Sequence, residues 1–300
     1  MDTAVVMQEK DLQKVTARQR VVKILVKTLT YVFLGGMALI VLFPFYWMII
    51  SSLKTLEEYR RNVPTFWPEK IMWNNYTAAF QIADLGSLFV NTVYVGVVST
   101  ILSLVITVLT AFAFARLEFK GKGLLFAGLL ATMMIPGEMF TITNYQTVVQ
   151  HFKWEGKFVA LIIPFLVSVF YIYLLRNNFL QIPDELYYAA KVDGTSDLKY
   201  LWKVMIPLAM PTLISITILK MMGSWNSYMW PKLVAGKDGL HDMITNGLRG
   251  ASFVNPDNPS EVDYPRQMAA VATVSAPLFL VFIFLRKYIM KGVSRSGIKG

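Results

Sequence analysis

Cysteine is absent from the 300 residues, and histidine occurs only twice. The missing cysteine excludes disulfides, thiolate metal sites and cysteine nucleophiles. His151 and His241 stand far apart without a carboxylate–histidine pattern, so we expect no histidine metal site. Charged residues are also scarce, at 16% of the chain, whereas 55% of the residues are hydrophobic. This balance is typical of a membrane protein and rare in a soluble domain.

The sequence also lacks the G-x-x-x-x-G-K-[ST] loop with which many ATPases hold nucleotide phosphates. The stretch GKGLLFAG contains glycines but has neither the strand-to-helix setting nor the Lys-Ser/Thr ending. We therefore expect no catalytic residue, metal or bound cofactor in this chain. Energy for any transport must come from a partner protein or from an ion gradient.

Six apolar segments are long enough to cross a bilayer as helices, which takes about 20 residues. They predict an all-α, polytopic membrane domain at 28–285, flanked by segments 1–27 and 286–300. Prolines recur within or beside the spans, where they serve either bundle packing or kinks that let a pathway open. The predicted spans lie at about 28–50, 87–115, 123–143, 158–175, 207–231 and 267–285.

The formal charge of +10 is distributed unevenly along the chain. If the N-terminus is cytoplasmic, the whole basic excess falls on the cytoplasmic side, and the opposite loops carry balanced charge. This is the positive-inside pattern, so both termini are predicted to be cytoplasmic. Topology then explains the charge without a nucleic-acid partner. The basic segments are 1–27, 116–122, 176–206 and 286–300.

The segment 176–206, between spans four and five, is too charged to cross a bilayer, yet its pattern is regular. Pro183 and the two acidic residues after it predict the start of a helix. Gly194 predicts its end, and Thr195 or Ser196 can cap a second helix. The expected apolar stripe of that second helix consists of Leu198, Leu201, Trp202 and Met205.

Small residues at Ala189, Ala190 and Gly194 would let another backbone or a large side chain approach this segment closely. The segment would then dock onto a partner protein. The alternative is that both short helices lie along the lipid headgroups. Periodicity alone does not separate these two interpretations.

The stretch YAAKVDG resembles the EAA loop of bacterial ABC importer permeases, in which Glu-Ala-Ala is followed two residues later by Asp-Gly. Ala189, Ala190, Asp193 and Gly194 match that pattern. Pro207 follows at the family's spacing of 13 residues after the glycine. In that family the loop, here at 183–207, is a coupling helix that docks in a cleft of the ATPase subunit.

Tyr188 departs from the pattern, because the family usually has Glu at this position. A salt bridge made by that Glu cannot form here. Glu185, about one helical turn earlier, is a candidate substitute. Val204 and Ile206 also differ from the Ile and Leu of the family.

Other stretches extend the resemblance along nearly the whole chain, specifically to the MalG-like branch of carbohydrate importer permeases. They are FPFYWMIISSLKT, AFAFARLEFKGK, MMIPGEMFTI, GSWNSYMWP and KGVSRSGIKG. The ordered set implies the type I importer fold in the bacterial cell membrane and transport of a sugar, with an oligosaccharide as the expectation. It also implies a homologous second permease, two ATPase subunits that hold ATP and Mg²⁺, and an extracellular substrate-binding protein.

Two ionisable residues lie inside predicted spans, where charge is costly and marks a functional hypothesis. Glu138 and Lys220 fall at similar depths, so they can pair with each other or reach the outer interface. The sharper alternative places Lys220 on the translocation cavity, where it would favour an anionic or strongly hydrated sugar.

A sugar path needs aromatic surfaces for C–H faces and amides for hydroxyl groups. Trp225 and Asn226 offer that chemistry near the outer end of span five. Tyr228 and Trp230 fit an aromatic belt at the membrane interface slightly better. Asn91, in an otherwise apolar span, is either an interhelical hydrogen-bond partner or a path residue.

Two other functions compete with that of an importer permease. An ion-coupled secondary carrier needs intramembrane carboxylates or an inverted repeat. Only Glu138 qualifies, and no repeat is apparent. A membrane-embedded enzyme needs a reactive cluster of Asp, Glu or His, which the sequence does not show. The sequence therefore favours a non-catalytic transport subunit.

Overall fold

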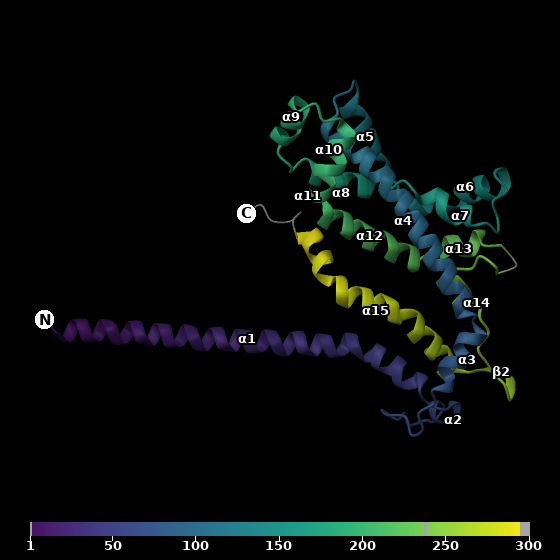
Figure 1. The fold of residues 1–300 in the computed structure, drawn as a ribbon. Coiled ribbons are helices and arrows are strands. Elements are labelled where there is room, and N and C mark those ends of the chain that lie inside the picture. Colours follow the sequence, from purple (N-terminus) through teal and green to yellow (C-terminus); the bar gives the residue numbers. More distant parts are fainter. Residues whose placement is uncertain (1, 237–238, 295–300) are drawn as a thin grey trace.

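The computed structural model describes residues 2–236 and 239–294, with side chains described over 22–236 and 239–286. Three helical stretches are long and apolar enough to cross a membrane. The first is Val22–Ser52, within helix α1 (Asp2–Ser52), and the second is helix α4 (Leu85–Arg116). The third is Tyr264–Arg286, within helix α15 (Tyr264–Ser294). Figure 1 shows α4 at the centre and α1 extending away from the remaining helices.

The other three predicted spans are each broken into a pair of helices. Helix α5 (Lys122–Thr132) meets the helical stretch Gly137–His151 at 84°. The stretch Phe158–Phe165 meets helix α8 (Val169–Phe179) at 46°. A third pair, detailed below, bends by 80°. If each bent pair is one span, the described chain has up to six spans, the number expected from the sequence.

The breaks fall within the spans predicted at 123–143, 158–175 and 207–231, where the prolines predict kinks. Pro136 adopts an extended conformation (φ −56°, ψ 130°) just before the turn that follows α5. Ser168 is likewise extended before α8, four residues after Pro164. Proline removes a backbone donor and disfavours helix in the residue before it, so apolar composition alone cannot show where a span breaks.

Short elements connect the spans. In the third bent pair, the stretch Asp197–Leu208 meets α12 (Met210–Trp225). It comprises α10 (Asp197–Tyr200), a π-helical turn (Leu201–Met205) and α11 (Ile206–Leu208), and α9 (Asp184–Val192) precedes it. The third and fourth spans include 3₁₀ turns at Gly137–Phe140 and Ile163–Phe165, a π-helical turn at Gln146–His151, α6 (Thr141–Tyr145) and α7 (Phe158–Ile162). The remaining helices are α2 (Leu56–Tyr59), α3 (Asn74–Ile82), α13 (Met229–Val234) and α14 (Ile244–Gly250). The two strands β1 (Val254–Asn255) and β2 (Asn258–Val262) pair antiparallel.

Helix α4 is the best-buried of the three continuous spans, with 39% of its most apolar window buried, against 6% for α1. Small polar side chains form the buried face of α4 and recur every three or four residues, which allows close helix packing in a membrane. They include Ser99, Ser103 and Thr107. The apolar surface of Val22–Ser52 stays largely exposed in the single chain and is available to lipid or to another subunit.

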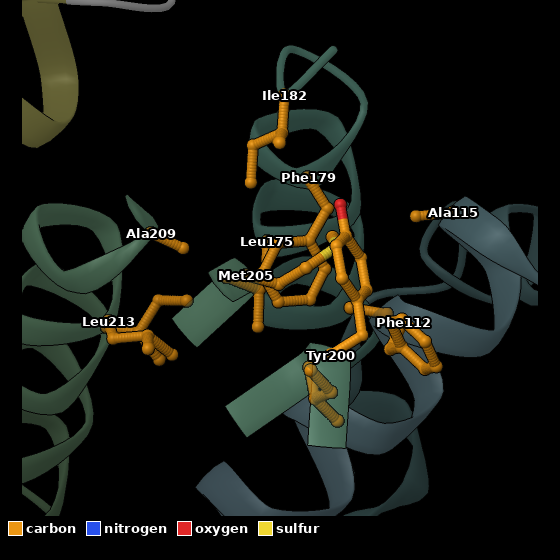
Figure 2. Packing of buried hydrophobic residues seen from close by; sticks show 12 residues of the cluster. Phe112, Ala115, Leu175, Phe179, Ile182, Tyr200, Met205, Ala209 and Leu213 are labelled. Carbon is orange, nitrogen blue, oxygen red and sulfur yellow. The ribbon is translucent and has the colours of Figure 1, made fainter. Parts of the chain in front are cut away.

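One apolar cluster joins the end of α4 to α8 and to the start of the fifth span. Phe112, Phe179, Tyr200 and Met205 are all buried there, and Figure 2 shows them packed together. The elements that contribute these residues lie far apart in the sequence. Packing of this density resists small shifts, so the helices that share the cluster are held as a unit.

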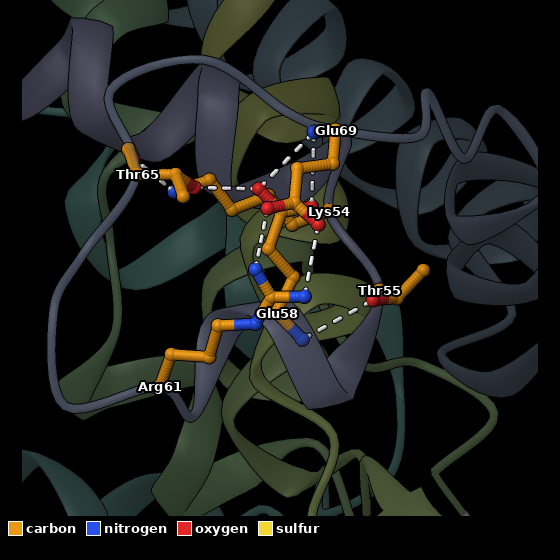
Figure 3. Close-up of polar contacts among 6 residues, drawn as sticks. All are labelled: Lys54, Thr55, Glu58, Arg61, Thr65 and Glu69. Atoms are coloured by element: carbon orange, nitrogen blue, oxygen red, sulfur yellow. Dashed lines mark hydrogen bonds and ion pairs between the residues drawn. The ribbon is translucent and has the colours of Figure 1, made fainter.

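The loop that follows α1 is closed by two buried charged side chains, shown in Figure 3. Lys54 donates to the carbonyl of Thr65, and its ammonium lies 4.8 Å from the ring centre of Trp47. The carboxylate of Glu58 accepts from the Thr65 hydroxyl and from the amide of Glu69. These bonds give the motif SSLKT a structural role in ordering the loop.

At the surface of the same loop, Arg61 donates to Glu69 through both terminal nitrogens. This hydrogen bonding lowers the pKa of the Glu69 carboxyl below its ordinary value. Both side chains are about half exposed. Solvent screens such a pair, so we assign it little of the stability of the loop.

A substitution at Gly247 of α14 can test how tightly the loop around α14 packs on α4. A Cβ added at Gly247 would lie 2.3 Å from Cδ2 and 3.1 Å from Cγ of the buried Leu88. We expect Gly247→Ala to destabilise the protein by about 1–3 kcal/mol because the core must move to admit a methyl group. Gly250→Ala in the same helix is the matched control, since nothing lies within 4 Å of its added Cβ. Thermal unfolding of the two purified variants checks this, and equal midpoints would contradict the packing.

Candidate functional site

The predicted helical hairpin is present at 183–207, and its turn is built by Gly194. Gly194 has φ +70°, a left-handed conformation that glycine adopts without strain. The amide of Thr195 donates to the carbonyl of Ala190 (2.8 Å), and the amide of Gly194 donates to that of Lys191 (3.0 Å). This pair of bonds is a Schellman motif, which ends α9 and turns the chain toward α10.

The second helix of the hairpin begins as expected but does not continue as expected. Ser196, one of the two predicted caps, accepts a hydrogen bond from the amide of Lys199. The four residues of the predicted apolar stripe do not share one environment. Leu201 and Met205 are buried, whereas Leu198 and Trp202 are exposed. The π-helical turn at Leu201–Met205 changes the angular spacing of these residues.

Polar contacts lock the two short helices together. The hydroxyl of Tyr187 and the ammonium of Lys191 both bond Oδ1 of Asp197, each at 2.7 Å. The bond to the Asp197 carboxylate raises the pKa of Lys191 above its ordinary value. The ring of Tyr187 packs edge-on against buried Tyr200 at 5.2 Å. The hairpin is therefore a preformed body rather than a slack loop.

Arg116, the last residue of α4, fixes the base of the hairpin to the membrane domain. Its side chain is 3% exposed and lies 2.7 Å from the carboxylate of Asp184, at the start of α9. The same guanidinium donates to the carbonyls of Phe179 (3.0 Å) and Ile182, which connect α8 to α9. Sequence reasoning missed this role, because a lone Arg at the end of a span is ordinarily interpreted as reaching for the interface.

The hairpin presents an apolar face that no described residue covers. Val192 is 88% exposed and Tyr188 is 65% exposed, and both lie on α9. Ala190 is the exception among the motif residues, because it packs partly against the buried cluster. The other predicted docking residues are all exposed, namely Glu185, Ala189, Asp193, Gly194 and Pro207.

Lys220 lies on α12, the helix that follows the hairpin, and beside the break in the fourth span. Its ammonium donates to the carbonyl of Phe165 (2.5 Å), at the end of the first half of that span. Glu138 lies on the exposed turn after α5, and the salt bridges among described residues do not pair it with Lys220. Lys220 lines a cavity of about 360 Å³. The polar side chains around that cavity are Ser99, Ser168, Tyr171, Ser224, Ser227 and Trp230.

The other predicted path residues have structural partners outside this cavity. Asn91 donates to the carbonyls of Leu240 and Asp242, both at 3.0 Å, so it binds a loop rather than another span. Asn226 caps the end of α12 by donating to the carbonyl of Met222. Trp225 packs on Phe89 at 5.6 Å between ring centres. Neither Trp225 nor Asn226 lines the cavity that holds Lys220.

Trp230 does not belong to an interface belt, and that interpretation is corrected. Its side chain is 7% exposed, and its indole nitrogen donates to the carbonyl of Ala160 at 2.9 Å. Its ring meets Phe165 edge-on at 5.3 Å, beside the Lys220 cavity. Tyr228 is half-buried, and its hydroxyl accepts from Lys232.

The family model described as "Binding-protein-dependent transport system inner membrane component" matches residues 15–295. The arabinooligosaccharides transport system permease protein AraQ of Halalkalibacterium halodurans is 29% identical to this chain, over 88% of this chain and 93% of AraQ. The diacetylchitobiose uptake system permease protein NgcG of Streptomyces coelicolor is 27% identical, over 86% and 84% of the two chains. In a crystal structure of a bacterial ABC transporter involved in the import of the acidic polysaccharide alginate, one chain superposes with a TM-score of 0.76. That chain is 24% identical, and the match covers 87% of this chain and 95% of that one.

The structural match confirms the predicted all-α, type I importer permease fold. The family model extends from the first span to the last described helix. The chain belongs to the family of binding-protein-dependent transport system inner membrane components.

Proposed function

We propose that this chain is the permease subunit of an ATP-driven importer of carbohydrate, with an oligosaccharide as the expected substrate. Family membership supports the transport role. The names of two relatives refer to transport of arabinooligosaccharides and to uptake of diacetylchitobiose. These names support an oligosaccharide as the substrate. The coupling role is supported chiefly by the hairpin at 183–207. Its two helices are joined by the Lys191–Asp197 ion pair, its base is bound by the buried Arg116, and its apolar face is exposed.

The proposed complex contains a homologous second permease, two ATPase subunits and an extracellular substrate-binding protein. ATP and Mg²⁺ would bind to the ATPase subunits, and this chain would be non-catalytic. The exposed apolar surface of Val22–Ser52 fits contact with lipid and with a second membrane subunit. The complex would lie in the bacterial cell membrane, with the hairpin and both termini on the cytoplasmic side.

In this proposal the ATPase grips the exposed face of α9. Complete burial of one large apolar side chain contributes about 1.5–3 kcal/mol, and Tyr188 and Val192 lie one helical turn apart on this face, so together they can hold a partner. Ala189 and Gly194 carry little or no side chain, which lets the wall of a cleft approach the backbone. Glu185 and Asp193 supply charge beside that face.

Tyr188 gives the contact an aromatic side chain where the family has a carboxylate. Its ring centre lies 6.0 Å from that of Tyr187, and its exposed surface is free to pack on a partner. Glu185 is exposed three residues earlier on the same helix. We propose that Glu185 makes the ionic contact with the ATPase and that Tyr188 makes an apolar one.

Movement of the hairpin would reach the spans by two routes. Arg116 links α9 directly to the end of α4. The apolar cluster around Phe179 and Tyr200 links the hairpin to α8 and α12. Because both routes are buried and close-packed, a rigid-body shift of the hairpin would move three spans rather than deform the loop. An ion-coupled carrier is not favoured, since such a carrier has no ATPase subunit to bind the exposed apolar face of the hairpin.

Gly194→Asn tests the docking. Asparagine tolerates the left-handed conformation better than most residues, and nothing within the chain lies within 4 Å of an added Cβ. We therefore expect the variant to insert and fold normally while its side chain obstructs the ATPase. Stimulation of ATP hydrolysis in the purified complex should fall about tenfold or more, corresponding to roughly 1.4 kcal/mol of lost coupling.

Gly121→Asn is the matched control, because Gly121 also has a positive φ (+81°) and open space around an added Cβ, but lies between α4 and α5. This control should keep near-normal ATPase stimulation. Wild-type stimulation and uptake by stably inserted Gly194→Asn would contradict docking at this turn.

Arg116→Met tests the link between the hairpin and α4. Loss of the guanidinium leaves the carbonyls of Phe179 and Ile182 without their donor, which we expect to cost about 1–3 kcal/mol. Proteolysis within 183–207 should accelerate, and ATP hydrolysis should become less dependent on substrate. Lys122→Met is the control, since Lys122 pairs with exposed Glu118 and makes no other ion pair among the described residues. Equal protease resistance of the two variants would refute the anchoring role.

A further inference from the structure

The cavity beside Lys220 has the size and chemistry of a subsite for a single sugar unit. Its volume of about 360 Å³ falls at the lower end of the range for small-molecule pockets. Ser99, Ser168, Ser224 and Ser227 line its wall, and serine hydroxyls can exchange hydrogen bonds with the hydroxyls of a sugar ring. The rings of Phe165, Tyr171 and Trp230 supply apolar surface for C–H faces.

Lys220 gives this cavity a positive charge that no salt bridge among the described residues neutralises. Its hydrogen-bond partner is the neutral carbonyl of Phe165. No carboxylate is among the described residues that line the cavity. An ammonium group inside a membrane span is costly unless an anion or strong hydrogen-bond acceptors surround it. The cavity therefore favours a ligand that carries a negative charge.

The broken fourth span adds to the positive potential. Helix α8 begins at Val169, directly after Ser168, which lines the cavity. The first turn of a helix carries amide groups without helical partners and a partial positive charge, which favours anions. The ammonium of Lys220 and the start of α8 therefore border the same hydroxyl-lined space.

We propose that this cavity is a subsite for a carboxylate-bearing sugar unit, a hexuronate, and that Lys220 selects for it during transport. The inference rests on the proposed function, since it assumes that this chain carries carbohydrate. The ammonium turns from the Phe165 carbonyl to the sugar carboxylate, and the serine hydroxyls bind the ring hydroxyls. No covalent step is involved.

The test compares two sugars that differ only at C6, D-galacturonate and D-galactose, as probes of the assembled complex in lipid nanodiscs. Equilibrium dialysis with radiolabelled sugar measures binding in the absence of the soluble binding protein. We expect galacturonate to bind at least about tenfold more tightly than galactose, the ratio that one ionic hydrogen bond of roughly 1.4 kcal/mol provides. In Lys220→Met the two sugars should bind equally weakly, and Lys220→Arg should retain most of the preference.

Lys232→Met is the matched control. Lys232 bonds the hydroxyl of Tyr228 outside the cavity, so its loss removes the same charge without touching the site. Thermal unfolding of each variant verifies that it is folded. Equal affinity for both sugars, a preference that survives Lys220→Met, or no saturable binding of either sugar would overturn the subsite and leave Lys220 as a clamp on the Phe165 carbonyl. The proposed function fails separately, by loss of ATPase stimulation in the wild-type complex.

Discussion

The guanidinium of Arg116 is the contact on which the proposed mechanics depend. It is buried where α4 ends, and it bonds both the carboxylate at the start of α9 and the carbonyls that connect α8 to α9. A hairpin with an exposed apolar face could dock on a partner without this contact, but it would swing freely. Arg116 and the apolar cluster hold its base, so in the proposed mechanism a force applied at Val192 would be transmitted to the spans.

The broken spans are the second constraint, and they link mechanics to the transport path. A break frees backbone carbonyls and amides that a continuous helix would satisfy internally. At the break in the fourth span, the freed carbonyl of Phe165 takes the ammonium of Lys220, and the start of α8 borders the same cavity. Span five carries both Lys220 and, at its start, the second helix of the hairpin. In the proposed mechanism, movement of the hairpin would reach this cavity through the bent pair of helices that forms span five.

The sequence predicts the local features well, because their causes are local. The turn at Gly194 and the cap at Ser196 depend on backbone and side-chain preferences within a few residues, and both are confirmed. Burial of Trp230 and the bonds of Asn91 to Leu240 and Asp242 depend on segments 70 and about 150 residues away. The anchoring role of Arg116 is of the same kind. The stretch Leu201–Met205 is π-helical rather than α-helical. There the α-helical spacing of apolar residues no longer shows which side of the helix is buried.

The most direct test of the account is a cross-link from the tip of the hairpin. Because the chain has no cysteine, Val192→Cys provides one attachment point for a benzophenone maleimide, on a side chain that is 88% exposed. Val63→Cys, 78% exposed in the loop after α2, serves as the control, since α2 lies at the opposite end from α9 in Figure 1. The account predicts that, after reconstitution with the partner subunits and irradiation, the label at position 192 cross-links the ATPase subunit and the label at position 63 does not. Absence of an ATPase cross-link from position 192 in a complex that hydrolyses ATP and imports its substrate would contradict it.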